Sequence, residues 1–233
     1  RETISACVFS PSFGNPLGHC MPDAARRRLV EELTARQIPL IEDDVYGELA
    51  FGARRPRAVK SFDSEGLVLL CSSFSKSVAP GYRIGWAAPG RYRDRVEKLK
   101  FASSVATATP TQMALAAFLA EGGFDRTLRQ LRREYRVLVA QMSAAVARHF
   151  PEGTRVSRPE GGHIIWVEMP EPADSVRLHE EALAFGVSIA PGILFSTSKR
   201  YRNCLRLNCA VPWNPEVEAA VEHLGRLARA QLA

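Results

Sequence analysis

The segment SSFSKSVAPGYRIGW, residues 72–86, contains the side chains of this chain that are best suited to covalent chemistry. The amine of Lys76 can form an imine with an aldehyde. The hydroxyls of Ser73 and Ser75 can donate hydrogen bonds to phosphate oxygens, and the planar guanidinium of Arg83 can bind a phosphate through two donors. Small neighbouring residues let the backbone approach such a group closely. The segment therefore predicts a covalent site for a phosphorylated aldehyde cofactor.

An ordinary lysine in a surface loop is the alternative explanation of Lys76. The chain has only five lysines among its 31 basic residues, so a lysine at this position is less expected as surface filler. That count does not decide the matter, and support has to come from other positions.

Asn15 lies in the turn-rich loop SPSFGNPLGHCMP, residues 10–22, which follows a predicted strand. Ligands of α/β proteins bind at the carboxyl ends of strands, so Asn15 stands where a ligand can be bound. Asn-Pro is also a common turn-forming pair, and the tetrapeptide alone is a weak signal.

The predicted strand PLIEDD, residues 39–44, ends in carboxylates. Such groups are costly to bury at the mouth of an apolar strand unless a positive group meets them. Asp43 and Asp44 are both candidates for the carboxylate that meets such a positive group. A solvent-facing acidic turn is the explanation that involves no ligand.

Arg206 lies between two leucines in the predicted strand CLRLNCA, residues 204–210. An arginine in that setting should seek an anionic partner, and its planar fork suits a carboxylate. The alternative is an arginine on an edge strand that points to water. His163 stands alone at the start of a strand, and we assign it no catalytic role.

The pattern of apolar residues predicts the elements that must position these side chains. An amphipathic helix over 22–36 between two strands makes a βαβ unit, which favours a parallel sheet. Helical spacing of apolar residues predicts a long helix over 125–150. The other expected strands are 3–10, 66–73, 84–89, the two around 159–162, 187–190 and 204–210; the other expected helices are 90–103, 111–121, 174–185 and 214–230, with a polar break at 107–111.

Composition excludes several classes of protein. The chain has 233 residues, of which 46% are hydrophobic, enough for a substantial core. No apolar run is long enough to span a bilayer, so we expect a cytoplasmic protein. Five cysteines without a C-x-x-C pair indicate neither a disulfide framework nor a metal site. The net charge is +6, but the basic residues are spread along the chain, so we expect the run Arg26-Arg27-Arg28 to be solvated helix charge rather than a DNA contact.

The lysine segment resembles the pyridoxal phosphate (PLP) segment of fold-type I aminotransferases, SFSK-x-x-APG-x-R-x-GW. Residues 15–18 match the N-P-x-G motif of the same family, and the other candidates follow in the family's order. The resemblance implies an α/β fold-type I structure, made of part of a large domain with a parallel or mixed sheet and a small α+β domain. We expect the first over 1–134 and the second over 135–233.

The resemblance also implies a role for each candidate. The lysine holds PLP as an imine, the serines and the arginine bind its phosphate, and the aspartate pairs with its pyridine nitrogen. The asparagine and the tyrosine contact its phenolic oxygen, and the strand arginine binds the carboxylate of the substrate. Carried onto this sequence, the catalytic residue is Lys76; the residues that bind the cofactor are Asn15, Asp43, Tyr46, Ser73, Ser75, Lys76 and Arg83; and those that bind the substrate are Arg206 and Asn15.

Within this family, four segments are most similar to the aminotransferase-like domain of MocR regulators, which belong to the GntR group. They are residues 10–22, 73–86, 109–135 and 161–170. That likeness implies a PLP domain that senses an amino acid or amine, works as a homodimer, and reaches DNA only through a winged-helix domain outside this chain. The alternative is a free-standing aminotransferase of the 2-aminoadipate or kynurenine type, in which Lys76 also moves the α-proton.

The chain begins at Arg1 rather than at methionine and enters a strand at once, which indicates a fragment. The family's glycine-rich phosphate loop and the aromatic residue that stacks on the cofactor would both precede Arg1. We therefore expect this chain alone to have weak or absent transaminase activity.

Overall fold

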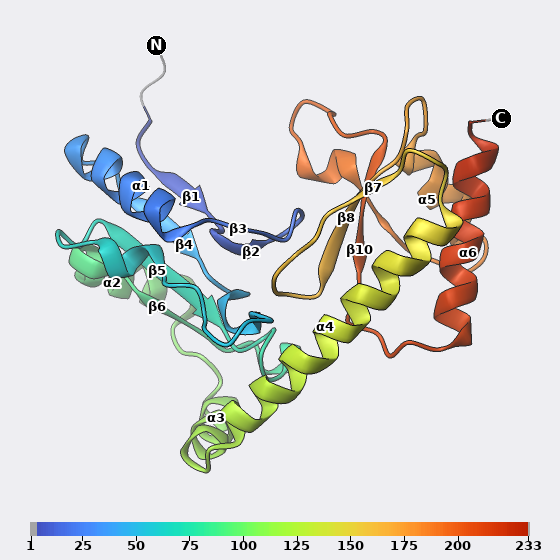
Figure 1. Cartoon of the computed structure of the whole chain (residues 1–233). Helices are drawn as coiled ribbons and strands as arrows, with labels where there is room; N and C mark the ends of the chain where they lie inside the picture. Colours follow the sequence, from blue (N-terminus) through green and yellow to red (C-terminus); the bar gives the residue numbers. More distant parts are fainter. Residues whose placement is uncertain (1–3, 233) are drawn as a thin grey trace. The chain divides into compact units, whose positions relative to one another are not determined.

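The computed structural model describes residues 4–232, and Figure 1 shows its elements along the chain. The chain divides into two compact units. Unit 1 contains the chain up to Gly14 and His19–Arg132, and unit 2 contains Asn15–Gly18 and everything from Arg133 onward. The long helix α4 (Gly123–His149) contributes residues to both units.

Unit 1 is built on a four-stranded sheet with the order β1-β4-β5-β6. The strands β1, β4 and β5 are parallel, whereas β6 is antiparallel to β5. The helix α1 connects β1 to β4, so the βαβ unit predicted from the sequence is confirmed. The bounds are β1 (Cys7–Phe9), α1 (Asp23–Ala35), β4 (Leu40–Asp43), β5 (Val68–Ser73) and β6 (Gly85–Ala88); a small hairpin of β2 (Ser12–Gly14) and β3 (His19–Cys20) lies between β1 and α1.

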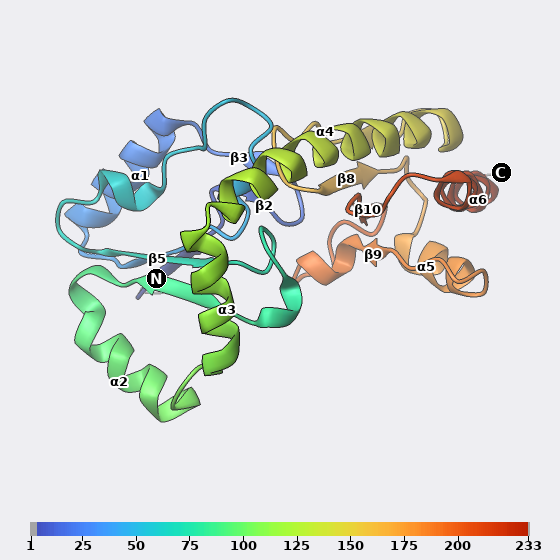
Figure 2. The same cartoon turned by 90° about the horizontal axis from the view of Figure 1, so that it is seen from below.

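Helices lie on both faces of this sheet, with α1 on one side and α2 (Arg93–Ser104) and α3 (Thr109–Ala120) on the other (Figure 2). Apolar residues on the α1 side form a core of Val30, Leu40, Val59 and Val68. Val30 lies on α1 and Leu40 and Val68 on the central strands, so the buried stripe of the helix packs on the buried face of the sheet.

Two details differ from the sequence-based expectations in unit 1, and a third agrees with them. β1 is shorter than the expected strand 3–10, because its pairing with β4 extends only from Cys7 to Phe9; Thr3 lies outside the described residues. The expected polar break is shorter, since α3 begins at Thr109 and takes Pro110 into its first turn, where proline is tolerated. The break between α3 and α4 falls at Gly122, which has a φ of +71°.

Unit 2 contains an antiparallel sheet with the order β7-β8-β10-β9 and the helices α5 and α6. Side chains of α5 and α6 such as Leu178 and Leu224 are fully buried. Both helices begin at a side-chain cap, since Asp174 accepts a hydrogen bond from Val176 N and Asn214 accepts one from Val217 N. The bounds are β7 (Arg155–Val156), β8 (Ile164–Glu168), α5 (Ser175–Leu183), β9 (Ala190–Pro191), β10 (Cys204–Asn208) and α6 (Pro215–Ala230).

A strand was expected over 187–190, but β9 contains only Ala190 and Pro191. The expectation was therefore wrong for residues 187–189. Val187 N donates a hydrogen bond to Ala182 O at 3.1 Å and thereby closes the end of α5. The residue is used to terminate a helix and is not available for a strand.

Candidate functional site

The lysine segment leaves the end of β5 as a tight loop. The carbonyl of Phe74 accepts hydrogen bonds from three backbone amides, those of Ser77, Val78 and Ala79, at 2.8–3.3 Å. Phe74 N in turn donates to Ile84 O at 3.1 Å, where the chain returns toward β6. Lys76 therefore lies at the tip of a loop whose backbone is closed by its own hydrogen bonds.

Beside this loop, two hydroxyls and a guanidinium form a cluster. Ser73 Oγ donates to Ser75 Oγ at 2.9 Å, and Ser75 N donates to Ser73 Oγ at 3.1 Å. Arg83 Nη1 lies 3.4 Å from Ser75 Oγ, and Arg83 takes a left-handed backbone conformation with a φ of +54°. These are the residues predicted to bind a phosphate, and the structure brings their donors together at one end of the sheet.

The Lys76 side chain faces Tyr46 within unit 1. Its Nζ atom lies 5.9 Å from the centre of the Tyr46 ring, which is 8% exposed. An aromatic face at this distance attracts a cation. The sequence spacing alone did not indicate this contact.

The two neighbouring aspartates at the end of β4 differ sharply. Asp44 is 1% exposed and forms an ion pair with Arg55, whose Nε donates to Glu48 Oε1 at 2.6 Å. Burial raises the pKa of the Asp44 carboxyl, although Arg55 opposes that shift. Arg55 thus engages the carboxylate that was the alternative to Asp43.

Asp43 points to the other face of the strand, as the alternation of side chains along β4 requires. It is half-buried, and its oxygens make two long contacts, with Val45 N and Ser10 Oγ, each at 3.4 Å. Among the described residues it has no cationic partner within ion-pair distance. Its carboxylate therefore remains able to accept a further donor.

In unit 2, Arg206 lies on β10, which pairs with β8 on one side and β9 on the other. The strand is not at the edge of the sheet, so the alternative of an edge arginine does not apply. Arg206 Nη1 donates to Asn15 Oδ1 at 3.4 Å, and its Cζ lies 5.8 Å from the centre of the Phe195 ring. Its Nε is buried and has no hydrogen-bond partner among the described residues.

Gly18 fixes the segment that carries Asn15. It has a φ of +69°, and a Cβ at this position would lie 2.9 Å from Pro159 Cβ. A side chain is excluded on both counts, by backbone conformation and by space. The N-P-x-G tetrapeptide thus packs closely in unit 2, where Asn15 meets Arg206.

The predicted site residues therefore fall into two groups, one in each unit. The group in unit 2 is Asn15 and Arg206. The group in unit 1 is Asp43, Tyr46, Ser73, Ser75, Lys76 and Arg83.

Sequence reasoning missed two contacts to these groups. Phe195, in the short helical turn Gly192–Phe195, lies against Arg206, and Ser10 lies next to Asp43. Ser10 is the last residue of a predicted strand, which is a usable signal, whereas nothing local in the sequence connects Phe195 with an arginine on a later strand.

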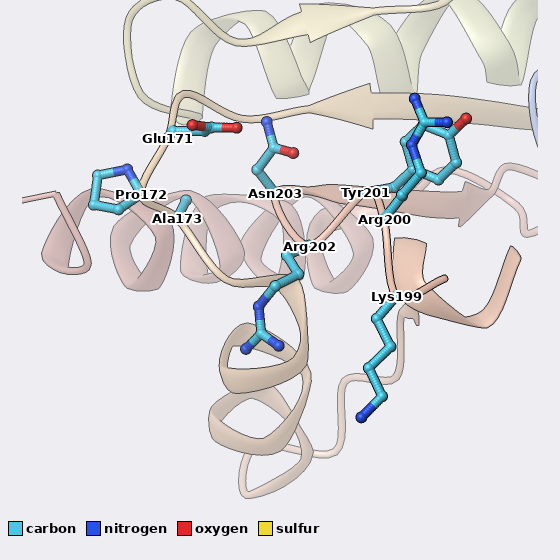
Figure 3. A pocket seen from close by; sticks show the side chains of 8 residues that line it. All are labelled: Glu171, Pro172, Ala173, Lys199, Arg200, Tyr201, Arg202 and Asn203. Carbon is cyan, nitrogen blue, oxygen red and sulfur yellow. The ribbon is translucent and has the colours of Figure 1, made fainter. Parts of the chain in front are cut away.

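A cavity of about 330 Å³ in unit 2 lies between the turn at 171–173 and the segment 199–203 (Figure 3). None of the predicted site residues lines it. Its Tyr201 packs edge-on against Trp166, with ring centres 5.9 Å apart. It is therefore a surface feature separate from both groups.

No group of three or more histidine, cysteine, aspartate or glutamate side chains in the described part of the chain could hold a metal ion. None of the helices in residues 4–232 is both long and apolar enough to cross a membrane.

The family model for aminotransferase class I and II matches residues 2–224. The chain is 42% identical over 222 residues to the HTH-type transcriptional regulator YjiR of Escherichia coli, an alignment that covers 95% of this chain and 47% of the relative. The chain thus spans about half the length of that protein.

Two solved structures are also similar. One is LysN, an α-aminoadipate aminotransferase of Thermus thermophilus complexed with N-(5'-phosphopyridoxyl)-L-leucine; the TM-score is 0.90 and the identity 31%, covering 97% of this chain and 59% of that one. The other is the kynurenine aminotransferase of Pyrococcus horikoshii, with a TM-score of 0.91 and 29% identity, covering 98% and 57% of the two chains.

Proposed function

Because the chain belongs to the aminotransferase class I and II family, we propose that it is the effector-sensing part of a GntR/MocR-type transcriptional regulator. In this proposal it binds an amino acid or amine through pyridoxal 5'-phosphate, the family's cofactor, at Lys76. The observation that carries the choice of a regulator is the 42% identity to an HTH-type regulator over 95% of the chain.

The residues present in unit 1 fit this cofactor. A phosphate needs several convergent donors, and Ser75 lies between two others, with Ser73 Oγ at 2.9 Å and Arg83 Nη1 at 3.4 Å from its own Oγ. When bound, PLP supplies an aldehyde carbon that a primary amine can attack and a ring that withdraws electrons.

Each remaining residue of unit 1 has a distinct task in this proposal. Lys76 would contribute the amine that holds the cofactor aldehyde, the carbon to which a ligand amine would also bind. Asp43 would accept a hydrogen bond from the protonated ring nitrogen, because its carboxylate has no cationic partner among the described residues, whereas that of Asp44 pairs with Arg55. Tyr46, which faces Lys76, would contact the phenolic oxygen.

Arg206 and Asn15 bind the ligand carboxylate in this proposal. The guanidinium has a buried Nε without a partner among the described residues, and a buried donor of this kind is costly to leave unmatched. A carboxylate can accept from Nε and an Nη together, as a bidentate pair. Asn15, already 3.4 Å from Nη1, restricts the orientation of the fork.

The alternative is a free-standing aminotransferase of the 2-aminoadipate or kynurenine type that moves an amino group from an amino acid to a 2-oxo acid. It is supported by the likeness to two such enzymes at TM-scores of 0.90 and 0.91. In that case Lys76 would also carry the α-proton between positions on the substrate.

The first experiment reduces the PLP-treated protein with borohydride and locates the label by mass spectrometry. We expect the label on Lys76 and its loss in Lys76→Arg, with Lys98→Arg in the exposed helix α2 as the matched control. A label that stays after Lys76→Arg would overturn the assignment.

The second experiment distinguishes sensor from enzyme. An amino acid should change the cofactor absorbance of the proposed sensor without continuing formation of the 2-oxo acid. Sustained turnover with an amino donor and a 2-oxo acid would establish the enzyme instead.

Arg206→Leu tests the carboxylate role. We expect weaker binding of an amino acid by about tenfold to a hundredfold, the scale of a lost charged hydrogen-bond pair. Binding of the corresponding decarboxylated amine should not change. Equal losses for both ligands would exclude a specific role in carboxylate binding.

Dimerisation and a cytoplasmic location complete the proposal, and both rest on the resemblance to regulators of this family. Light scattering of the purified protein should give a mass of twice the monomer. A monomer at micromolar concentration would argue against a homodimer.

A further inference from the structure

The run Arg26-Arg27-Arg28 is not the uniform solvated face that its sequence suggests. Arg26 is fully buried, and its guanidinium donates to several groups, which include Met21 O at 2.7 Å and Arg57 O at 2.6 Å. Arg27 is exposed, and its Cζ lies 5.0 Å from the centre of the Phe62 ring. Of two adjacent arginines, one supports the fold and the other stays on the surface.

A second exposed arginine lies against the same ring. The Cζ atom of Arg57 is 4.4 Å from the centre of Phe62, although Arg57 belongs to the loop before the 3₁₀ turn Val59–Phe62. We call Arg27, Arg57 and Phe62 the arginine–phenylalanine patch. It unites residues from α1 and from a loop that follows β4.

The backbone under this patch is firmly held. Arg26 binds the carbonyl of Arg57, and the buried carboxylate of Glu42 accepts from Val59 N at 2.7 Å and from Lys60 N at 2.9 Å. Phe62 itself packs against the apolar core on the α1 side of the sheet. The backbone that carries the two guanidiniums is therefore rigid. Less conformational entropy is lost from this part of the protein when a partner binds.

The charges of the patch are not neutralised within the described residues. Neither Arg27 nor Arg57 forms an ion pair there, whereas nearby Lys60 pairs with Asp63, and Arg55 with Asp44 and Glu48. The positive charges of Arg27 and Arg57 repel each other across the Phe62 ring. An anion close to both guanidiniums would offset this repulsion. The site thus favours a partner that presents negative charge.

We propose that the arginine–phenylalanine patch contacts the phosphodiester backbone of double-stranded DNA. Arginine pairs with phosphate through planar, bidentate donors, and DNA offers a continuous row of phosphates that such a pair can meet in any register. The inference rests on the proposed function, because a regulator brings this chain to DNA. It goes beyond the expectation that DNA is reached only through a domain outside this chain.

The test measures binding of the 233-residue chain to a fluorescent duplex by anisotropy over a series of KCl concentrations. The variant Arg27→Gln/Arg57→Gln should weaken binding and reduce the slope of log K against log salt by about 2, one for each lost phosphate contact. The matched control is Arg126→Gln/Arg129→Gln, which removes the same charge from exposed positions of α4.

Three results would overturn the proposal. One is an equal change of slope in the control variant, which would indicate net charge alone. Another is equally tight binding of polyglutamate and of duplex, which would indicate an acidic protein partner. The third is an unchanged slope in the patch variant.

Two further variants separate this proposal from others. Phe62→Tyr should retain DNA binding and Phe62→Leu should lose part of it, because the ring aligns both guanidiniums. Lys76→Arg should abolish PLP labelling and leave DNA binding intact, so the failure of one proposal is distinguishable from the failure of the other.

Discussion

The two units bury different kinds of side chain. Unit 1 buries the charged side chains of Arg26, Glu42 and Asp44, while the buried polar residues described in unit 2 are His163 and Ser175. Buried charges must be matched by partners at short range, so they determine where the surrounding loops lie. The loops of unit 1 are thus held by hydrogen bonds and ion pairs to buried charges, whereas Arg206 lies on a paired strand against the ring of Phe195.

The largest effect should come from breaking the buried network of unit 1. Arg55→Leu leaves Asp44 without its ion-pair partner, and we expect unfolding to become easier by about 3 kcal/mol in urea titrations at neutral pH. Arg93→Leu, which removes an exposed pair with Glu97, should cost less than about 1 kcal/mol. Equal effects would contradict the contrast between buried and exposed charge.

The stability lost in Arg55→Leu should depend on pH, and the direction of this dependence follows from the pKa of Asp44. Burial raises the pKa of Asp44 above its ordinary value of 3.8, and removing Arg55 should raise it further. A raised carboxyl pKa favours the folded state while the group is protonated, and this advantage is lost as pH rises through the folded pKa. The defect of Arg55→Leu should therefore shrink as pH is lowered.

Helix caps give the next largest contrast. The helices α5 and α6 of unit 2 have side-chain caps, whereas α1, α2 and α3 of unit 1 have none. Asn214→Ala should destabilise the protein by about 1 kcal/mol in urea unfolding, because Val217 N loses its acceptor. Ala108→Asp at the start of α3 should stabilise it by about 0.5–1 kcal/mol. An unchanged stability of Ala108→Asp would mean that the backbone N–H groups at the start of α3 already have other hydrogen-bond acceptors.

The aromatic support of Arg206 should have a smaller effect. Phe195→Leu removes the ring 5.8 Å from the guanidinium, and a cation–π contact contributes about 0.5–1 kcal/mol. In the PLP-loaded protein, affinity for an amino acid should fall about twofold to fivefold. Phe195→Tyr should restore it, and binding of the decarboxylated amine should stay constant. An equal loss with the amine would show general disruption of the loop.

Thiol reactivity provides a contrast that needs no substitution. Burial raises the pKa of Cys204 to about 11 and that of Cys209 to about 12, and both lie in unit 2. The half-buried cysteines of unit 1 are Cys7, Cys20 and Cys71. Under native conditions, mass spectrometry after brief alkylation at pH 8 should find label on unit 1 cysteines before Cys204 and Cys209. Early labelling of Cys209 would indicate opening of unit 2.

Much of the fold could be predicted from local sequence patterns. The helices α1, α4 and α6 begin and end within about two residues of their expected bounds, because their apolar spacing and end signals are local. The errors at β1 and β9 have a common cause, since the length of a strand depends on its partner. β1 ends where β4 stops pairing with it, and the residues before β9 are used to close α5.

The sequence by itself determined the family and the identity of the candidate residues, because short segments such as SFSK and N-P-x-G carry both in adjacent positions. Tertiary structure decided which side chains already have a partner and which are exposed. The carboxylate of Asp44 forms an ion pair with Arg55, whereas that of Asp43 has no cationic partner among the described residues. Arg26 is buried, and its neighbour Arg27 is exposed. Phe195 lies on Arg206 although the sequence gives no sign of it. Each of these outcomes depends on contacts between distant parts of the chain, which local spacing cannot specify.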